Sequence, residues 1–92
     1  MTISDIFRSN VKVSPNPTSG EISVSFDLNS ANNLRLVVTD LHGRELLEIH
    51  NGTINEGTFS KTFSVASLPT GTYYLLMLHN DKNINVKIII KK

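Results

Sequence analysis

The chain has 92 residues, which is enough for one small domain with a modest hydrophobic core. It contains no cysteine, so disulfide frameworks and thiolate metal sites are excluded. Nine Lys and Arg against eight Asp and Glu leave a net charge of +1, too small for the broad positive field that nucleic-acid binding normally requires. The longest uninterrupted apolar run, 73–78, is far too short to span a bilayer, and residues 1–10 lack the form of a secretory signal peptide.

Alternation of apolar and polar residues predicts half-buried strands along most of the chain. No window shows convincing helical periodicity. Seven short strands separated by turn residues favour an all-β fold, and we expect an immunoglobulin-like antiparallel β-sandwich. The strands are expected over 11–14, 21–27, 34–38, 45–50, 59–65, 72–79 and 84–91.

Turn residues separate these strands. The two prolines make Pro15–Gly20 a rigid turn, since proline lacks the amide hydrogen that a central strand donates. Asn29–Asn33 is expected to be a polar loop. Asp40–Arg44 is a turn in which Asp bonds the backbone and Gly43 accepts positive φ. Further connections are expected at Asn51-Gly52 with Glu56-Gly57, at Leu68–Gly71, where Gly71 also suits positive φ, and at Asn80–Asn83.

The stretch Tyr73–Leu78 is apolar on both faces. Tyr73, Leu75 and Met77 point one way, whereas the residues between them point the other. The first face suits the core. The second face is covered either by a neighbouring part of the domain or by another protein, and self-association at high concentration is expected from it.

Catalytic and metal-binding patterns are weak. His42, His50 and His79 fall in or beside separate turns and lack the short spacing of local metal pairs, which indicates surface histidines. Asn51-Gly52-Thr53 matches a glycosylation acceptor, but Asn-Gly is equally a hairpin signal and the turn is the favoured interpretation. We expect no catalytic residue, because no serine lies in a Gly-x-Ser-x-Gly nucleophile elbow and the chain has no cysteine. We expect no metal or cofactor either, because no loop shows the dense spacing of calcium ligands among the turn carboxylates Asp40, Glu45, Glu48, Glu56 and Asp81.

The ordered landmarks resemble one known family. They are Val13–Thr18, with Ser14-Pro15-Asn16-Pro17-Thr18 inside it, then Gly20, Val24–Phe26, Asp40–Arg44, Leu68–Tyr73 and Lys87–Ile89. Together they resemble the type A C-terminal sorting domain of the type IX secretion system, over residues 11–92. The recognition residues that this resemblance implies are Pro15, Asn16, Pro17, Gly20, Asp40, Gly43, Arg44, Leu68, Gly71, Tyr73, Lys87, Lys91 and Lys92.

The resemblance implies a secretion address rather than an enzyme. A larger N-terminal cargo, not included in this chain, would reach the periplasm by its own signal. The tail would then present it to the outer-membrane translocon and shuttle proteins, and a cell-surface sortase would remove the tail. The cargo would be released or joined to an anionic lipopolysaccharide at the outer-membrane surface. Residues 1–10 would be a linker or an added lead, with cleavage in or before them.

Each landmark also has a structural interpretation. Pro15 and Pro17 fix a turn, Leu68 and Tyr73 suit the core, and the lysines of the last strand protect a sheet edge from aggregation. For docking on the export machinery, we expect the C-terminal hairpin Thr72–Lys92 to be used, because it combines surplus apolar surface with terminal positive charge.

Two other classes of function compete with this hypothesis. A β-sandwich can serve as an adhesive or carbohydrate-binding module, although two tyrosines, four phenylalanines and no tryptophan leave few aromatic rings for a sugar platform. A small enzyme would need a concave site with converging titratable groups, which so short a sandwich seldom provides.

Overall fold

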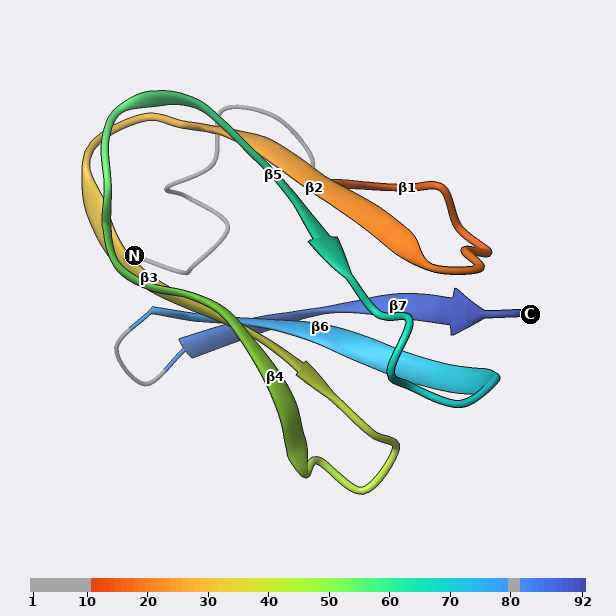
Figure 1. The fold of residues 1–92 in the computed structure, drawn as a ribbon. Coiled ribbons are helices and arrows are strands. Elements are labelled where there is room, and N and C mark those ends of the chain that lie inside the picture. Colours follow the sequence, from red (N-terminus) through yellow and green to blue (C-terminus); the bar gives the residue numbers. More distant parts are fainter. Residues whose placement is uncertain (1–10, 80–81) are drawn as a thin grey trace.

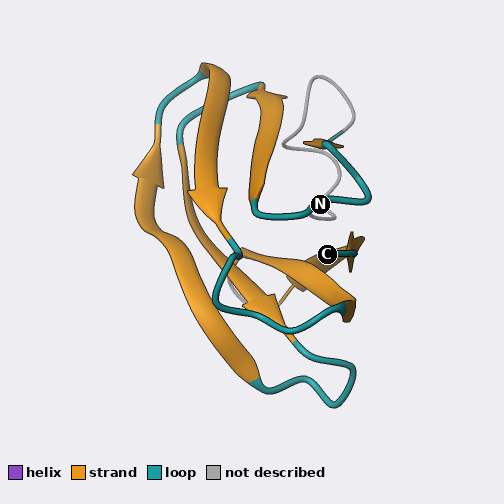
Figure 2. Ribbon diagram, turned by 45° about the vertical axis from the view of Figure 1, so that its right-hand side comes forward, coloured by secondary structure: helices purple, strands orange, loops and turns teal. Residues whose placement is uncertain are grey.

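The computed structural model describes residues 11–79 and 82–92, and these residues form strands and loops without a helix (Figures 1 and 2). This confirms the predicted all-β class. The seven strands are β1 (Lys12–Ser14), β2 (Glu21–Leu28), β3 (Asn32–Thr39), β4 (Glu45–Ile54), β5 (Gly57–Ser64), β6 (Gly71–His79) and β7 (Lys82–Ile90).

The strands form two antiparallel sheets that pack face to face. One sheet has the order β1-β2-β5 and the other has the order β4-β3-β6-β7. The chain crosses between the sheets at the β2–β3, β4–β5 and β5–β6 connections (Figure 1). Segments far apart in sequence therefore meet, as expected for an immunoglobulin-like sandwich.

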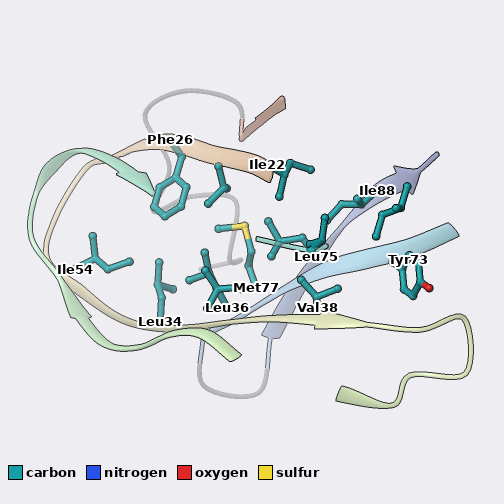
Figure 3. Close-up of a cluster of buried hydrophobic side chains, with 14 of the residues drawn as sticks. Ile22, Phe26, Leu34, Leu36, Val38, Ile54, Tyr73, Leu75, Met77 and Ile88 are labelled. Atoms are coloured by element: carbon teal, nitrogen blue, oxygen red, sulfur yellow. The ribbon is translucent and has the colours of Figure 1, made fainter. Parts of the chain in front are cut away.

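The core lies between the two sheets and is supplied by alternate strand residues. On β6, Tyr73, Leu75 and Met77 point inward, as the alternation predicts (Figure 3). Each large apolar side chain that is fully buried stabilises the fold by roughly 1.5 to 3 kcal/mol. The other buried members of this cluster are Ile22, Val24, Phe26, Leu28, Leu34, Leu36, Val38, Ile49, Ile54, Val65, Ile88 and Ile90.

The turn expected at Asn51-Gly52 is wrong, because both residues lie inside β4. Asn51 pairs with Arg35, and Gly52, with a φ of +147°, pairs with Leu34. The pairing with β3 satisfies the backbone groups that a turn would leave free, so β4 continues to Ile54. His50 likewise lies in a strand rather than beside a turn.

Two loop boundaries also differ from the prediction. Asn32 and Asn33 belong to β3, where they pair with the end of β4, so the polar loop is shorter than expected. Asn83 belongs to β7, whereas Asn80 and Asp81 of the expected turn lie outside the described residues. In both places the ladder to the neighbouring strand outweighs the low β propensity of asparagine.

Register shifts in the β3–β4 ladder place two carboxylates on the outer face of the four-stranded sheet. Val37 pairs with Glu48, and Thr39 pairs with Glu45, after shifts on either side of Val37 and Val38. A bulge locally interrupts the ladder and leaves a backbone group without its strand partner. Lys61 Nζ donates to the Ile49 carbonyl, 2.7 Å away, within this irregular stretch.

Candidate functional site

One end of the sandwich gathers the segments that the sequence singles out. Because the strands alternate in direction, three of its connections and the last two residues of the chain lie at the same end, on the right in Figure 1. We call this region the motif end. It consists of the segments 15–20, 40–44, 65–70 and 91–92.

Asn16 joins the two sheets at the motif end. Its side-chain Nδ2 donates to the Lys87 carbonyl at 3.0 Å, and its Oδ1 accepts from the Ile89 amide at 2.9 Å. One side chain therefore satisfies a donor and an acceptor on the edge of β7, as a paired strand would. The side chain of Lys87, in contrast, is exposed on the outer face of the sheet.

Thr18 extends this contact along β7. Its amide donates to the Ile89 carbonyl and its carbonyl accepts from the Lys91 amide, both at 2.9 Å. The Thr18 side chain is 2% exposed, and its hydroxyl donates to the Glu21 carbonyl. Thr18 is thus a positioning residue that was missing from the predicted recognition residues. The segment Pro15–Thr18, with its two cis X-Pro bonds, covers the exposed edge that the terminal lysines were expected to protect.

Leu68–Tyr73 forms a tyrosine corner. The Tyr73 hydroxyl donates to the Pro69 carbonyl, 2.7 Å away, and the ring is 8% exposed. A tyrosine near the start of the sixth strand that bonds back a few residues is a hallmark of immunoglobulin-like sandwiches. Leu68 packs partly buried against the core, as predicted.

The positive φ expected for Gly71 is wrong. Among the described glycines, positive φ occurs at Gly43, Gly52 and Gly57. Gly71 instead pairs with Ile90 at the start of β6, and the Tyr73 ring lies 3.7 Å from where a Cβ would be. Its backbone is held in the ladder, and a Cβ at this position would make only an ordinary van der Waals contact with the Tyr73 ring.

The two terminal lysines differ in how they are held. Lys92 Nζ donates to the Ala66 carbonyl at 2.6 Å, and the Lys92 amide donates to Thr70 Oγ1 at 3.2 Å. Lys91 is fixed through its backbone to Thr18, while its side chain is exposed. The C-terminal residues are therefore tied to two different loops of the motif end.

Asp40–Arg44 forms the predicted turn. Asp40 Oδ1 accepts from the amides of His42 at 2.8 Å and Arg44 at 3.0 Å, and Arg44 Nε donates to Asp40 Oδ2 at 2.7 Å. The Arg44 guanidinium is the main cause that lowers the pKa of Asp40 to about 2, although partial desolvation opposes the shift. Gly43 has a φ of +85°, as predicted.

A hollow of about 290 Å³ lies beside this turn, on the outer face of the four-stranded sheet. It is lined by Thr39, Leu41, Tyr74, Leu76 and neighbouring residues of the turn and β7. Leu41 is 62% exposed at its rim. The second face of Tyr73–Leu78 is thus half-buried and forms part of an open surface.

The histidines do not form a common site. His42 is exposed in the turn, the His50 ring meets the edge of Phe59 at 5.5 Å between centroids, and His79 Nδ1 lies 3.2 Å from the Asn33 carbonyl. Within residues 11–79 and 82–92, no three His, Asp or Glu side chains are grouped so as to hold a metal ion. The same residues include no helix able to cross a membrane.

Comparison with known proteins places these motifs in one family. A search of curated proteins found no match. The family model described as the secretion system C-terminal sorting domain, in contrast, matches residues 12–91, which include the whole motif end except Lys92. The chain belongs to the family of secretion system C-terminal sorting domains.

Proposed function

We propose that this domain directs an attached N-terminal cargo through the type IX secretion system. We further propose that the secretion machinery recognises the domain by binding its motif end. Membership of the family makes the domain a C-terminal sorting signal of type IX secretion. It also implies interaction with the type IX machinery and transit to the outer membrane or cell surface. The proposal that the machinery binds the motif end rests on one observation: the four motif segments meet at one end of the sandwich.

Rigidity of the motif end supports this proposal. Asn16 and Thr18 hold the first turn on β7, Tyr73 holds the β5–β6 connection, and Lys92 ties the C-terminus to that connection. A surface whose parts are fixed before contact loses less conformational entropy on binding than flexible segments do. The arrangement therefore suits recognition of the folded domain rather than of an extended peptide.

The direction of β1 also suits a tail. β1 runs toward the motif end, antiparallel to β2, so the chain enters β1 from the side that faces away from the motif end. The motif end would remain open to the machinery while the cargo is attached. Cleavage by a surface sortase would then occur upstream of β1, away from the motif end that the machinery binds.

Charge at the motif end suggests the chemistry of the contact. Lys91 presents an exposed ammonium group beside Lys92, and no ion pair with a carboxylate is found for either within the described residues. An acidic surface on the machinery would complement these charges and speed encounter. A substitution of Lys91 tests the role of charge more cleanly than one of Lys92, because the Lys92 side chain also bonds the Ala66 carbonyl in the β5–β6 connection.

A matched pair of charge reversals tests the proposal. Lys91→Glu changes the motif end, and Lys82→Glu makes the same change at the opposite end of β7. Both residues are exposed, so both variants are expected to retain the parent's unfolding curve. Each variant is fused to a periplasmic reporter in a type IX host, and the fraction of reporter at the cell surface is measured.

We expect Lys91→Glu to lower surface delivery and Lys82→Glu to leave it at the parental level. Equal delivery by both variants would contradict recognition through the lysine at the motif end. Loss of delivery in Lys82→Glu alone would place the contact at the other end of the sandwich. Unfolding curves recorded on the same proteins separate these results from loss of the fold.

A further inference from the structure

The outer face of the four-stranded sheet has an unusual distribution of apolar residues. The face that a sheet turns to water usually carries polar side chains. Here the two central strands present Val37 from β3 and Tyr74, Leu76 and Leu78 from β6. Val37 is fully buried but does not belong to the core cluster, which shows that the outer face has an apolar strip of its own.

Charges flank this strip on opposite sides. The register of the strands gives one row across the sheet, Glu45–Thr39–Tyr74–Lys87, with a carboxylate on β4 at one end and an ammonium group on β7 at the other. The adjacent row runs from Glu48 through the strip to an asparagine of β7. The face therefore carries two carboxylates on β4 and one ammonium group, that of Lys87, on β7.

Arg35 neutralises part of the negative charge that the two carboxylates place on the β4 side of the face. Its guanidinium bonds Glu45 at 2.6 and 2.8 Å and Glu48 at 3.1 Å. Two carboxylates and one guanidinium leave one negative charge, which equals in size the positive charge of Lys87. Hydrogen bonds from Arg35 also hold the Glu45 carboxylate in place, so that this side of the face is ordered.

We propose that this face binds a second copy of the chain, related by a two-fold axis that runs parallel to the strands between β3 and β6. Such an axis exchanges left and right on the face while it keeps the position along the strands. It therefore places Glu45 of each copy opposite Lys87 of the other, at two equivalent positions. A surface that complements itself in this way is what a two-fold dimer requires.

Shape agrees with the same arrangement. The hollow beside the Asp40 turn lies on this face, and Leu41 projects from its rim with 62% of its surface exposed. In the dimer, the exposed Leu41 of the second copy faces this hollow and fills space there. The strip is covered, while the charged pairs form the polar rim that protein interfaces usually show.

Self-association through this face covers part of the 40–44 turn but leaves the other three segments of the motif end, 15–20, 65–70 and 91–92, accessible. Pro15–Thr18 and Lys91 contact the edge of β7 and the loops, whereas the dimer uses the flat side of the sheet. Two tails could thus pair while each still exposes Lys91, the residue that the delivery experiment changes. The inference rests on the strand register and charges, not on the secretion function, so the two can fail independently.

Sedimentation equilibrium of the 92-residue chain tests the proposal through a charge exchange. Lys87→Glu places two carboxylates opposite each other at each position, and Glu45→Lys places two ammonium groups there. We expect each variant to raise the dimer dissociation constant at least about tenfold, because opposed like charges are costly in an interface. An equimolar mixture of the two variants restores both opposite-charge pairs, so it should dimerise as the parent does.

Lys82→Glu serves as the control, because it makes the same charge change on β7 outside the row. It should dimerise like the parent, and circular dichroism confirms that each variant is folded. A parent chain that stays monomeric from micromolar to millimolar concentration would overturn the proposal. So would variants that dimerise as tightly as the parent, or a mixture that fails to recover, since either result places the contact on another surface.

Discussion

The contact between Asn16 and the edge of β7 gives the most specific stability prediction. Asn16→Ala removes two hydrogen bonds, to the Lys87 carbonyl and from the Ile89 amide. Each such bond contributes about 0.5 to 1.5 kcal/mol net to the free energy of unfolding. Because water can reach this exposed site, we expect the loss of both bonds to lie in the lower half of the summed range, about 1 to 2 kcal/mol. For a domain of this size, this loss lowers the melting temperature by about 5 to 15 °C.

The assay combines urea unfolding with amide hydrogen exchange. The Ile89 amide should exchange faster in Asn16→Ala, because its acceptor is gone. Asn16→Asp retains an acceptor for Ile89 but loses the donor to Lys87, so it should fall between the parent and Asn16→Ala. Asn55→Ala removes an exposed asparagine side chain for which the described residues provide no hydrogen bond, and it should unfold like the parent. Equal stability of Asn16→Ala and Asn55→Ala would refute the joining role of Asn16.

Three further predictions concern the corner, the turn and the core. Tyr73→Phe should destabilise the domain by about 1 kcal/mol in urea, because it removes one partly buried hydrogen bond, whereas Tyr74→Phe should have almost no effect. Stability should fall as the pH drops from about 4 to about 2, because unfolded Asp40 takes up a proton at higher pH than the folded residue does, and Asp40→Asn should weaken this dependence in urea titrations. Leu75→Ala should cost about 2 to 5 kcal/mol by circular dichroism, while Leu41→Ala should cost less than about 0.5 kcal/mol.

The local patterns in the sequence predicted the strands well wherever one face enters the core. The alternation of Tyr73, Leu75 and Met77 corresponds to burial in the structure because the two-residue period of a strand is a local property. The Asn51-Gly52 turn failed for the opposite reason. Whether that dipeptide turns or continues depends on pairing with β3, and the register of that pairing is not visible locally.

The motif end was predictable only where its contacts are local in sequence. The sequence singled out Asn16, Asp40 and Tyr73, and the turn formed by Asp40 followed from residues at most four positions apart. The bonds from Asn16 to β7 cross 71 and 73 positions, so that only the fold reveals them. The row that ends in Glu45 and Lys87 depends on the registers of three strand pairs, β3–β4, β3–β6 and β6–β7. No single segment of the sequence indicates these registers, so the row could not be predicted.

Delivery of a reporter by this domain tests the secretion function most directly. A periplasmic reporter that ends in residues 11–92 is expressed in a type IX host and in the same host without its outer-membrane translocon, and the surface fraction is measured in both. We expect surface delivery only where the translocon is present and the domain is attached. Equal delivery in both hosts, or retention of the reporter in the periplasm of the complete host, would contradict the function proposed for this chain.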